Sequence, residues 1–258
     1  MLVAVVQMKI TDGSPATNFD HAHTLINSSP GANLYLLPEL WTTGYAHSSW
    51  QDTAVNVTPK IYADLQEFSK SINAWIGGSM ISVNDEEQLV NRFWLFSPTG
   101  EPPIHYDKAH LFAPMLEDKY LASGTRRVQV TLGGIKASPS ICFDLRFPEM
   151  YRKAALEGAE LFLVSSEWPQ PRCETLRLLA RARAAENQAY LLLSNRLGPA
   201  KDGTTFCGES MIVGPDGSII SDAKDQEVVI TADLDPLHIP ELRSKFQVLT
   251  LTVNGVDS

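Results

Sequence analysis

Residues 135–165 have the sequence IKASPSICFDLRFPEMYRKAALEGAELFLVS. The mainly apolar run at 135–141 predicts a strand, and a turn follows it before Pro148. Pro148 begins a helical segment that ends near Gly158, and a continuous apolar strand follows at 161–165. A strand, a helix and a second strand in this order are typical of an α/β fold.

The same alternation continues on both sides of this stretch. Toward the N-terminus the pattern predicts two helices, at 15–29 and 61–71, and strands at 3–6, 34–37, 74–81 and 92–96. Toward the C-terminus it predicts a long helix at 172–190 and a strand at 190–194, then one strand on each side of a turn at 214–217 and another strand at 228–233. An amphipathic segment at 239–246 precedes an apolar, strand-like end. We expect the buried face of the long helix to carry Leu178, Leu179, Ala182, Ala185 and Ala189.

Strands and helices alternate in two successive cycles, the second of which begins near residue 128. This order predicts a four-layer α-β-β-α sandwich, with two mixed sheets face to face and the helices outside. A single doubly wound sheet is the alternative. No low-complexity linker separates the cycles, so we expect residues 1–258 to form a single domain.

Composition excludes several classes of protein. Hydrophobic residues make up 44% of the 258 residues, enough for a full core. The formal net charge of -9 argues against nucleic acid as a partner. The N-terminus lacks the features of a signal peptide, and no apolar run is long enough to span a membrane. We therefore expect a cytoplasmic protein without a membrane partner.

The three cysteines, Cys142, Cys173 and Cys207, form an odd count without paired spacing. This predicts no disulfide framework, and the absence of a C-x-x-C pair predicts no zinc or redox site. We expect Cys173 and Cys207 to be small packing residues, and we expect the protein to need neither metal nor cofactor.

Glu39 is the first candidate functional residue. It ends the apolar run at 34–37, in the sequence LPELWTTGY, and active sites of α/β folds gather at the carboxyl ends of strands. The alternative is that this carboxylate only marks where the strand leaves the core.

Lys108 is the second candidate, in the segment YDKAHLF at 106–112. Its aromatic and aliphatic neighbours favour a partly desolvated, paired amine, although such a lysine can also extend to water. His110 in the same segment raises the alternative of a Cys-His pair, in which His110 would be the base.

Cys142 is the third candidate, because it stands where a strand gives way to a turn and a helix. This topology projects a nucleophile and leaves the next backbone N–H free as an oxyanion donor. A cysteine at a strand end can also be just a small apolar residue. An ammonium group near Cys142 would lower the pKa of the thiol, and a carboxylate could carry its proton to departing ammonia.

At these three positions the sequence resembles the nitrilase, or carbon–nitrogen hydrolase, superfamily, over essentially the whole chain. The segments LPELWTTGY, DKAHLF and ICFDLRFPE carry the resemblance. It implies the four-layer sandwich, usually as a homodimer, and a hydrolase of linear amides. It also implies that Glu39 is the general base, Lys108 the cationic stabiliser and Cys142 the nucleophile. Glu117, more than Asp118, would orient Lys108 and the substrate amide.

Within the superfamily the chain looks most like the omega-amidases, which release ammonia from the terminal amide of 2-oxoglutaramate or 2-oxosuccinamate. CFDLRFPE, Trp168-Pro169 with Arg172, and ARAAENQ at 182–188 carry this likeness. Arg146 and Arg172 are candidates to bind a substrate carboxylate, and Arg146 could equally be structural. Phe143 and Glu167 depart from the usual tyrosine and asparagine, and a carboxylate at Glu167 would disfavour an anionic substrate unless it points away.

Three alternatives to an omega-amidase remain. The first is an N-carbamoyl amidohydrolase or another aliphatic amidase of the same superfamily. The second is an inactive binding module on the same fold, which the presence of all three triad residues disfavours. The third, an acyltransferase, would be expected to carry membrane segments.

Overall fold

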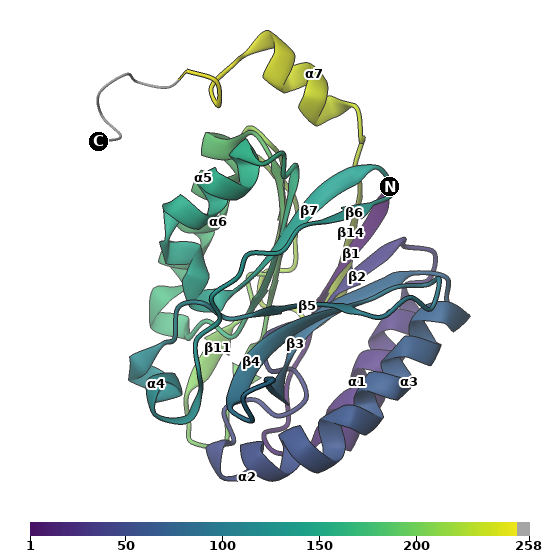
Figure 1. The fold of residues 1–258 in the computed structure, drawn as a ribbon, viewed down its shortest axis with the longest axis vertical. Helices are drawn as coiled ribbons and strands as arrows, with labels where there is room; N and C mark the ends of the chain where they lie inside the picture. Colours follow the sequence, from purple (N-terminus) through teal and green to yellow (C-terminus); the bar gives the residue numbers. More distant parts are fainter. Residues whose placement is uncertain (252–258) are drawn as a thin grey trace.

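The structure is a computed structural model that describes residues 1–251, and its main feature is a pair of six-stranded sheets packed face to face (Figure 1). The first sheet has the order β14 (Val228–Asp233), β1 (Leu2–Gln7), β2 (Leu34–Leu36), β3 (Trp75–Val83), β4 (Leu89–Phe96), β5 (Ile104–Asp107). The second has the order β13 (Ile219–Asp222), β12 (Met211–Val213), β9 (Tyr190–Asn195), β8 (Leu161–Ser166), β7 (Ile135–Ile141), β6 (Val130–Leu132). A separate hairpin joins β10 (Leu197–Pro199) and β11 (Thr205–Cys207).

Helices cover the outer face of each sheet. Figure 1 shows α1 (Pro15–Ser28) and α3 (Thr58–Ser71) against the first sheet, and α5 (Pro148–Leu156) and α6 (Cys173–Asn187) against the second. The shorter helices are α2 (His47–Asp52), which runs through a π-helical turn at Thr53–Val57 into α3, α4 (Glu117–Tyr120), and α7 (His238–Lys245). The four-layer sandwich is thus confirmed, and the single doubly wound sheet is wrong.

Both sheets are mixed, and their parallel strands lie at the centre. β1, β2 and β3 run parallel in one sheet, as do β7, β8 and β9 in the other. Because β1 is buried on both faces, its side chains alternate between two cores. Val3 and Val5 face the second sheet, while Ala4 and Val6 pack toward α1 and α3. The carboxyl ends of β2, β7 and β8 meet at one end of the sandwich.

The buried face of α6 differs from the prediction. Leu178 is 67% exposed, and the residues that face the sheet are instead Leu176, Ala180, Arg183, Ala184 and Asn187. Two of these are polar and bind backbone: the Arg183 guanidinium donates to the Leu145 carbonyl at 3.0 Å, and Asn187 donates to the Arg183 carbonyl at 2.9 Å. A prediction based on hydrophobicity alone treats Arg183 and Asn187 as exposed, and it therefore places the buried face of the helix wrongly.

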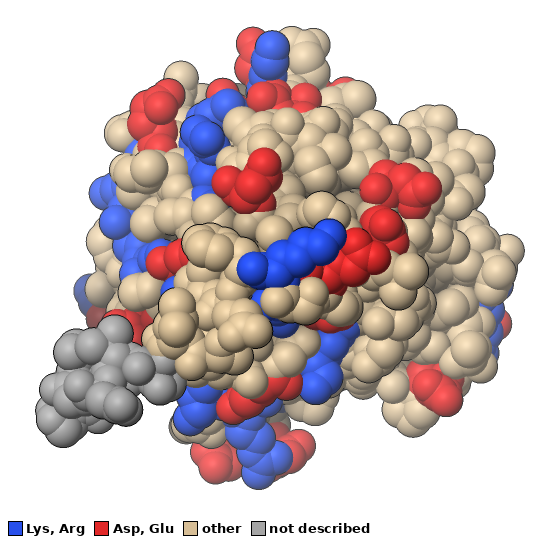
Figure 2. Space-filling model, turned by 90° about the horizontal axis from the view of Figure 1, so that it is seen from above, with Lys and Arg blue, Asp and Glu red and all other residues tan. Residues whose placement is uncertain are grey.

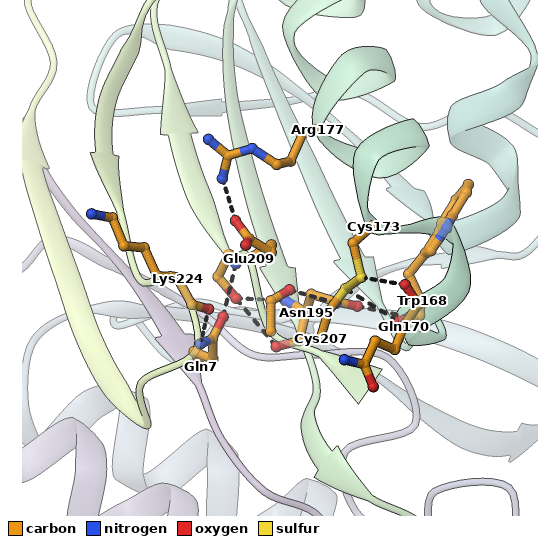
Figure 3. The surroundings of a disulfide bond; sticks show 11 residues. Gln7, Trp168, Gln170, Cys173, Arg177, Asn195, Cys207, Glu209 and Lys224 are labelled. Carbon is orange, nitrogen blue, oxygen red and sulfur yellow. Dashed lines mark hydrogen bonds and ion pairs between the residues drawn. A yellow bond between two sulfur atoms is a disulfide. The ribbon is translucent and has the colours of Figure 1, made fainter. Parts of the chain in front are cut away.

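The prediction of unpaired Cys173 and Cys207 is also wrong, because the structure joins them in a disulfide (Figure 3). They are 34 residues apart, but the hairpin β10–β11 folds back over the start of α6. Pro169 pairs with Phe206 there in an isolated bridge, which sets the two cysteines side by side. Sequence spacing cannot reveal such a long-range approach. Cys142 remains a free, buried thiol.

The end of the chain departs from the prediction as well. Residues 247–251 form no strand, and the rest of the strand-like end that we expected lies outside the described residues. Within residues 1–251 no helix is long and apolar enough to cross a membrane. On the face shown in Figure 2, basic and acidic side chains are interspersed.

Candidate active site

Cys142 lies at the sharp turn that the sequence predicts. It follows β7 directly and opens a 3-10 turn, Cys142–Arg146, which leads into α5. Its φ of 45° is in the left-handed region, which is rare for a side chain with a Cβ. The N–H groups at the start of such a turn have no partner inside it, so the Phe143 N–H can serve as a donor.

Asp144 holds this turn in place. Its Oδ2 accepts hydrogen bonds from the Ile141 N–H at 3.0 Å and the Tyr106 hydroxyl at 2.7 Å. Its Oδ1 accepts from the His110 N–H at 3.0 Å and lies 2.8 Å from His110 Nδ1. The His110 ring also stacks on Phe147. His110 is therefore part of the support for the turn, which argues against the Cys-His alternative.

Glu39 follows β2 and is fully buried, with four donors around its carboxylate. Oε1 accepts from Lys108 Nζ at 2.8 Å, Asn91 Nδ2 at 2.8 Å and the Tyr45 hydroxyl at 3.4 Å. Oε2 accepts from the Glu167 N–H at 2.9 Å. Glu167 directly follows β8, so this last bond connects the two sheets at the site.

Lys108 directly follows β5, and its ammonium group lies between two carboxylates. Nζ is 2.8 Å from Glu39 Oε1 and 2.7 Å from Glu117 Oε2, and all three side chains are fully buried. Glu117 begins α4, and its Oε2 also accepts the Phe112 N–H at 2.6 Å. Since an ammonium has three N–H donors, one is left for a further oxygen.

Burial and charge shift the pKa values of this cluster. Burial raises the pKa of Glu39, and the Lys108 ammonium partly opposes it. For Lys108, burial lowers the pKa, but Glu117 and Glu39 outweigh burial and the net pKa is raised. The ammonium therefore stays charged at neutral pH. Burial, Glu117 and Glu39 raise the pKa of Tyr45, whose hydroxyl remains a donor.

The Cys142 thiol belongs to the same cluster. Burial and the nearby Glu39 raise its pKa well above the ordinary value, against the opposing effect of Lys108. Lys108 does act to lower the pKa of the thiol, as expected, but burial and Glu39 outweigh it and the net pKa is raised. The resting thiol is neutral, and Glu39 is placed to take its proton.

A pocket of about 240 Å³, part of it open to solvent, leads to Cys142. Arg146 and Arg172 line it, and both are exposed. The Arg146 guanidinium lies over the Trp168 ring, 5.1 Å from its centre, and that of Arg172 lies 5.6 Å from the centre of Phe112. Within residues 1–251, neither guanidinium forms an ion pair with a carboxylate. The pocket thus offers two positive charges.

Glu167 also lines this pocket, but a cation behind the site holds its carboxyl group. Oε2 lies 3.0 Å from the Arg196 guanidinium, and both side chains are fully buried. Because Arg196 offsets the charge of Glu167, Glu167 disfavours an anionic substrate much less than the sequence alone suggests.

Sequence reasoning missed Asn91 and Tyr45, each of which touches two carboxylates. Asn91 Nδ2 lies 2.8 Å from Glu39 and 3.3 Å from Glu117, and the Tyr45 hydroxyl lies 3.0 Å from Glu117. One signal was available for Asn91: it is a polar residue in a strand, LVNRFWLF, whose residues are mostly apolar. The structure brings Glu39, Lys108, Glu117 and Cys142 together, whereas Asp118 lies outside this hydrogen-bonded cluster.

Comparison with known proteins identifies the family of the chain. The family model for carbon-nitrogen hydrolase matches residues 2–243. The 2-oxoglutaramate amidase of Bacillus subtilis (strain 168) is 32% identical over 247 residues, covering 95% of each chain. The omega-amidase YafV of Escherichia coli (strain K12) is 34% identical, over 95% of this chain and 93% of its own.

Solved structures of similar proteins share the fold. A CN-hydrolase superfamily protein from Xanthomonas campestris, with an arsenic adduct in its active site, matches with a TM-score of 0.89 at 27% identity and covers 96% of each chain. A mutant amidase from Nesterenkonia sp. AN1 matches with a TM-score of 0.84 at 27% identity, over 96% of this chain and 98% of its own. That structure shows acrylamide added to the active-site cysteine.

Proposed function

The chain belongs to the carbon–nitrogen hydrolase family, and from this premise we propose that it is a thiol-dependent omega-amidase. In this proposal residues 1–258 form one catalytic domain, which converts 2-oxoglutaramate or 2-oxosuccinamate to the 2-oxo acid and ammonia. The observation that carries the proposal is the buried contact of Lys108 with Glu39 and Glu117, beside the free thiol of Cys142.

The first half of the reaction forms a thioester. The amide carbonyl oxygen lies between the Lys108 ammonium and the Phe143 N–H, and the Cys142 sulfur attacks the carbonyl carbon. Glu39 takes the thiol proton as the S–C bond forms, and delivers it to the nitrogen as the C–N bond breaks. Ammonia leaves, and the acyl group stays on Cys142. One oxyanion donor of this kind can contribute roughly 3 kcal/mol to transition-state stabilisation.

The second half releases the acid. Glu39 takes a proton from water, the hydroxide oxygen attacks the thioester carbon, and the proton returns to sulfur as the S–C bond breaks. Glu117 holds Lys108 so that its third N–H stays directed at the substrate oxygen. Glu39, Lys108, Cys142 and Glu117 are thus the residues to which we assign catalysis, and the reaction needs no cofactor.

The substrate class rests on Arg146 and Arg172. At the pocket, two guanidinium groups have no carboxylate partner in the described part of the chain, which favours a ligand with a negative charge away from its amide. The 2-oxo acid amides have such a carboxylate, and the similar proteins described as 2-oxoglutaramate amidase and omega-amidase support the choice.

A simpler aliphatic amidase is the second candidate. The amidase from Nesterenkonia, whose cysteine carries added acrylamide, favours it, because acrylamide is a small amide without a carboxylate. An N-carbamoyl amidohydrolase would belong to the same chemical class but would release carbon dioxide together with ammonia.

A substrate screen tests these assignments. Ammonia release is measured with 2-oxoglutaramate, glutamine, carbamoyl amino acids and acrylamide, using the wild type and Cys142→Ala. We expect the highest kcat/KM for 2-oxoglutaramate and none with Cys142→Ala. Faster turnover of acrylamide would favour the second candidate, and turnover by Cys142→Ala would contradict the mechanism.

A further inference from the structure

A second group of buried charges lies directly behind the active site. The Arg196 guanidinium pairs through Nη1 with Glu167 at 3.0 Å and with Asp12 at 2.8 Å. Its Nη2 donates to the carbonyls of Ile10 at 2.9 Å and Pro199 at 3.3 Å. The backbone N–H of Glu167 bonds to Glu39, so this group and the amidase site form one connected cluster.

The two carboxyl oxygens of Glu167 have different surroundings. Oε2 accepts a hydrogen bond from Arg196. Oε1 is buried and has no hydrogen-bond partner within residues 1–251. A buried carboxylate oxygen without a donor costs far more free energy than the same oxygen carrying a proton. If Glu167 binds a proton, it is therefore on Oε1.

The net charge of the connected cluster also favours a proton on one of its carboxyl groups. Asp12, Glu39, Glu117 and Glu167 are four carboxyl groups that share two cations, Lys108 and Arg196. With all four ionised, the buried cluster would carry two more negative than positive charges. One proton on a carboxyl group relieves this excess.

Geometry decides which carboxyl group takes that proton. Glu39 accepts from four donors, whereas within residues 1–251 the carboxyl of Glu167 accepts from Arg196 alone. Ionised Glu39 is therefore better stabilised by hydrogen bonds. Burial raises the pKa of both groups: Lys108 opposes the rise for Glu39, and for Glu167 the pKa reaches about 8, with Arg196 opposing the rise and ionised Glu39 adding to it.

We propose that Glu167 is a positioning residue of the amidase site, which binds Glu39 through its backbone N–H and carries a proton on Oε1, so that Glu39 stays ionised and free to take the thiol proton. The inference rests on the proposed function. The groups that face Glu167 are Arg196, Asp12, Glu39, the Tyr45 hydroxyl and, in the pocket, Cys142 with Arg146 and Arg172. When Glu167 ionises, its new charge makes loss of the Cys142 proton less favourable.

The first experiment measures stability and needs no substrate. The unfolded chain ionises Glu167 near pH ~4.3, so between that pH and about 8 it binds fewer protons than the folded protein. The wild type must therefore lose stability with rising pH across this window, and Glu167→Gln lacks this loss. We expect the free energy of unfolding of Glu167→Gln minus that of the wild type to rise between pH 5 and pH 8. A difference that is constant or falls would overturn the proposal.

Glu160→Gln is the matched control, because Glu160 lies just before the opposite end of β8 and is partly exposed. Its unfolding free energy should keep the pH dependence of the wild type. If Glu160→Gln shows the same rise as Glu167→Gln, the effect is general and the proposal fails.

The second experiment is the pH profile of kcat/KM for the best substrate of the screen. For the wild type, kcat/KM should fall as pH rises through about 8, by up to ~10-fold per pH unit, as Glu167 ionises. Glu167→Gln should lack this fall. In Asp12→Asn, Arg196 still pairs with Glu167 but no longer with Asp12. Arg196 then stabilises ionised Glu167 more strongly, so the fall in kcat/KM should begin at lower pH.

If both variants have the pH profile of the wild type, the proposal is overturned. If Glu167→Gln folds poorly, an unchanged profile of Asp12→Asn alone overturns it. If no amide is hydrolysed, the proposed function fails, but the stability experiment still decides the protonation of Glu167. The two failures can therefore be told apart.

Discussion

Glu39 and Cys142 can be found in the sequence because each follows a predicted strand, and Lys108 because its neighbours are aromatic and aliphatic. Their partners are harder to find. Asn91 lies 52 positions from Glu39 in the sequence, and only the pairing of the strands brings its amide to 2.8 Å from the carboxylate. Local pattern therefore predicts candidate residues, while the hydrogen bonds between them depend on long-range packing.

Asn91 gives the first prediction, at the residue scale. Asn91→Ala removes a donor shared by Glu39 and Glu117, and should leave the two carboxylates to repel each other more strongly. A hydrogen bond to a charged group is worth about 1.5–3 kcal/mol, so we expect kcat/KM to fall about 10- to 100-fold. Steady-state assays of ammonia release measure this.

The control for this change is Asn56→Ala, because Asn56 is exposed and its side chain bonds to Asp52, outside the catalytic cluster. It should keep the kcat/KM of the wild type. An Asn91→Ala enzyme with normal kcat/KM would show that the amide is not needed to hold the carboxylates.

At the scale of elements, the positions of most helices and strands agree with the prediction to within a few residues. Hydrophobic periodicity succeeds there because the strands are buried on both faces and turn residues separate them. It fails on the orientation of α6, where Arg183 and Asn187 are buried because they bind backbone carbonyls. It also cannot reveal the disulfide, which depends on the hairpin β10–β11 folding onto α6.

The disulfide gives the second prediction. Closing a loop of 34 residues should stabilise the fold by about 3–4 kcal/mol through the lost entropy of the unfolded chain. Cys173→Ser should therefore lower the free energy of unfolding by this amount under oxidising conditions. Figure 3 shows Trp168 beside the bridge. Because Trp168 also lines the candidate pocket, KM is measured on the same samples.

A dithiol supplies the control for the disulfide. It should lower the stability of the wild type to that of Cys173→Ser and have no effect on that variant. If the dithiol and the substitution both leave stability unchanged, the bridge does not contribute to the fold in solution.

At the scale of the whole molecule, the order of elements and the family resemblance predicted the two stacked sheets correctly. Strand order within each sheet did not follow from the sequence, because β14 pairs with β1 across the entire chain. The charge distribution is also a whole-molecule property. The formal net charge is -9, yet the candidate pocket carries two arginines that form no ion pair within residues 1–251.

This contrast gives the third prediction. Removing both charges in Arg146→Gln/Arg172→Gln should raise KM for 2-oxoglutaramate by up to ~5-fold per arginine, since exposed ion pairs are worth up to about 1 kcal/mol. KM for acrylamide should not change. Added salt should raise KM for the anionic substrate of the wild type alone. Equal effects on both substrates would mean that the arginines only support the pocket.

The resemblance also implies a homodimer, which stays a proposal for this chain. Sedimentation equilibrium over a range of concentrations measures it, and we expect the mass of two chains. A mass of one chain, 28.4 kDa, at all concentrations would contradict the proposal.

The central claim is that Cys142 forms a thioester with the substrate. Acid quenching during turnover of 2-oxoglutaramate, followed by peptide mass spectrometry, tests it directly. We predict that the peptide containing Cys142 gains the mass of the acyl group left after loss of ammonia, and that Cys142→Ala shows neither this adduct nor turnover. Continued release of ammonia by Cys142→Ala, or an acyl group on another residue, would contradict the account.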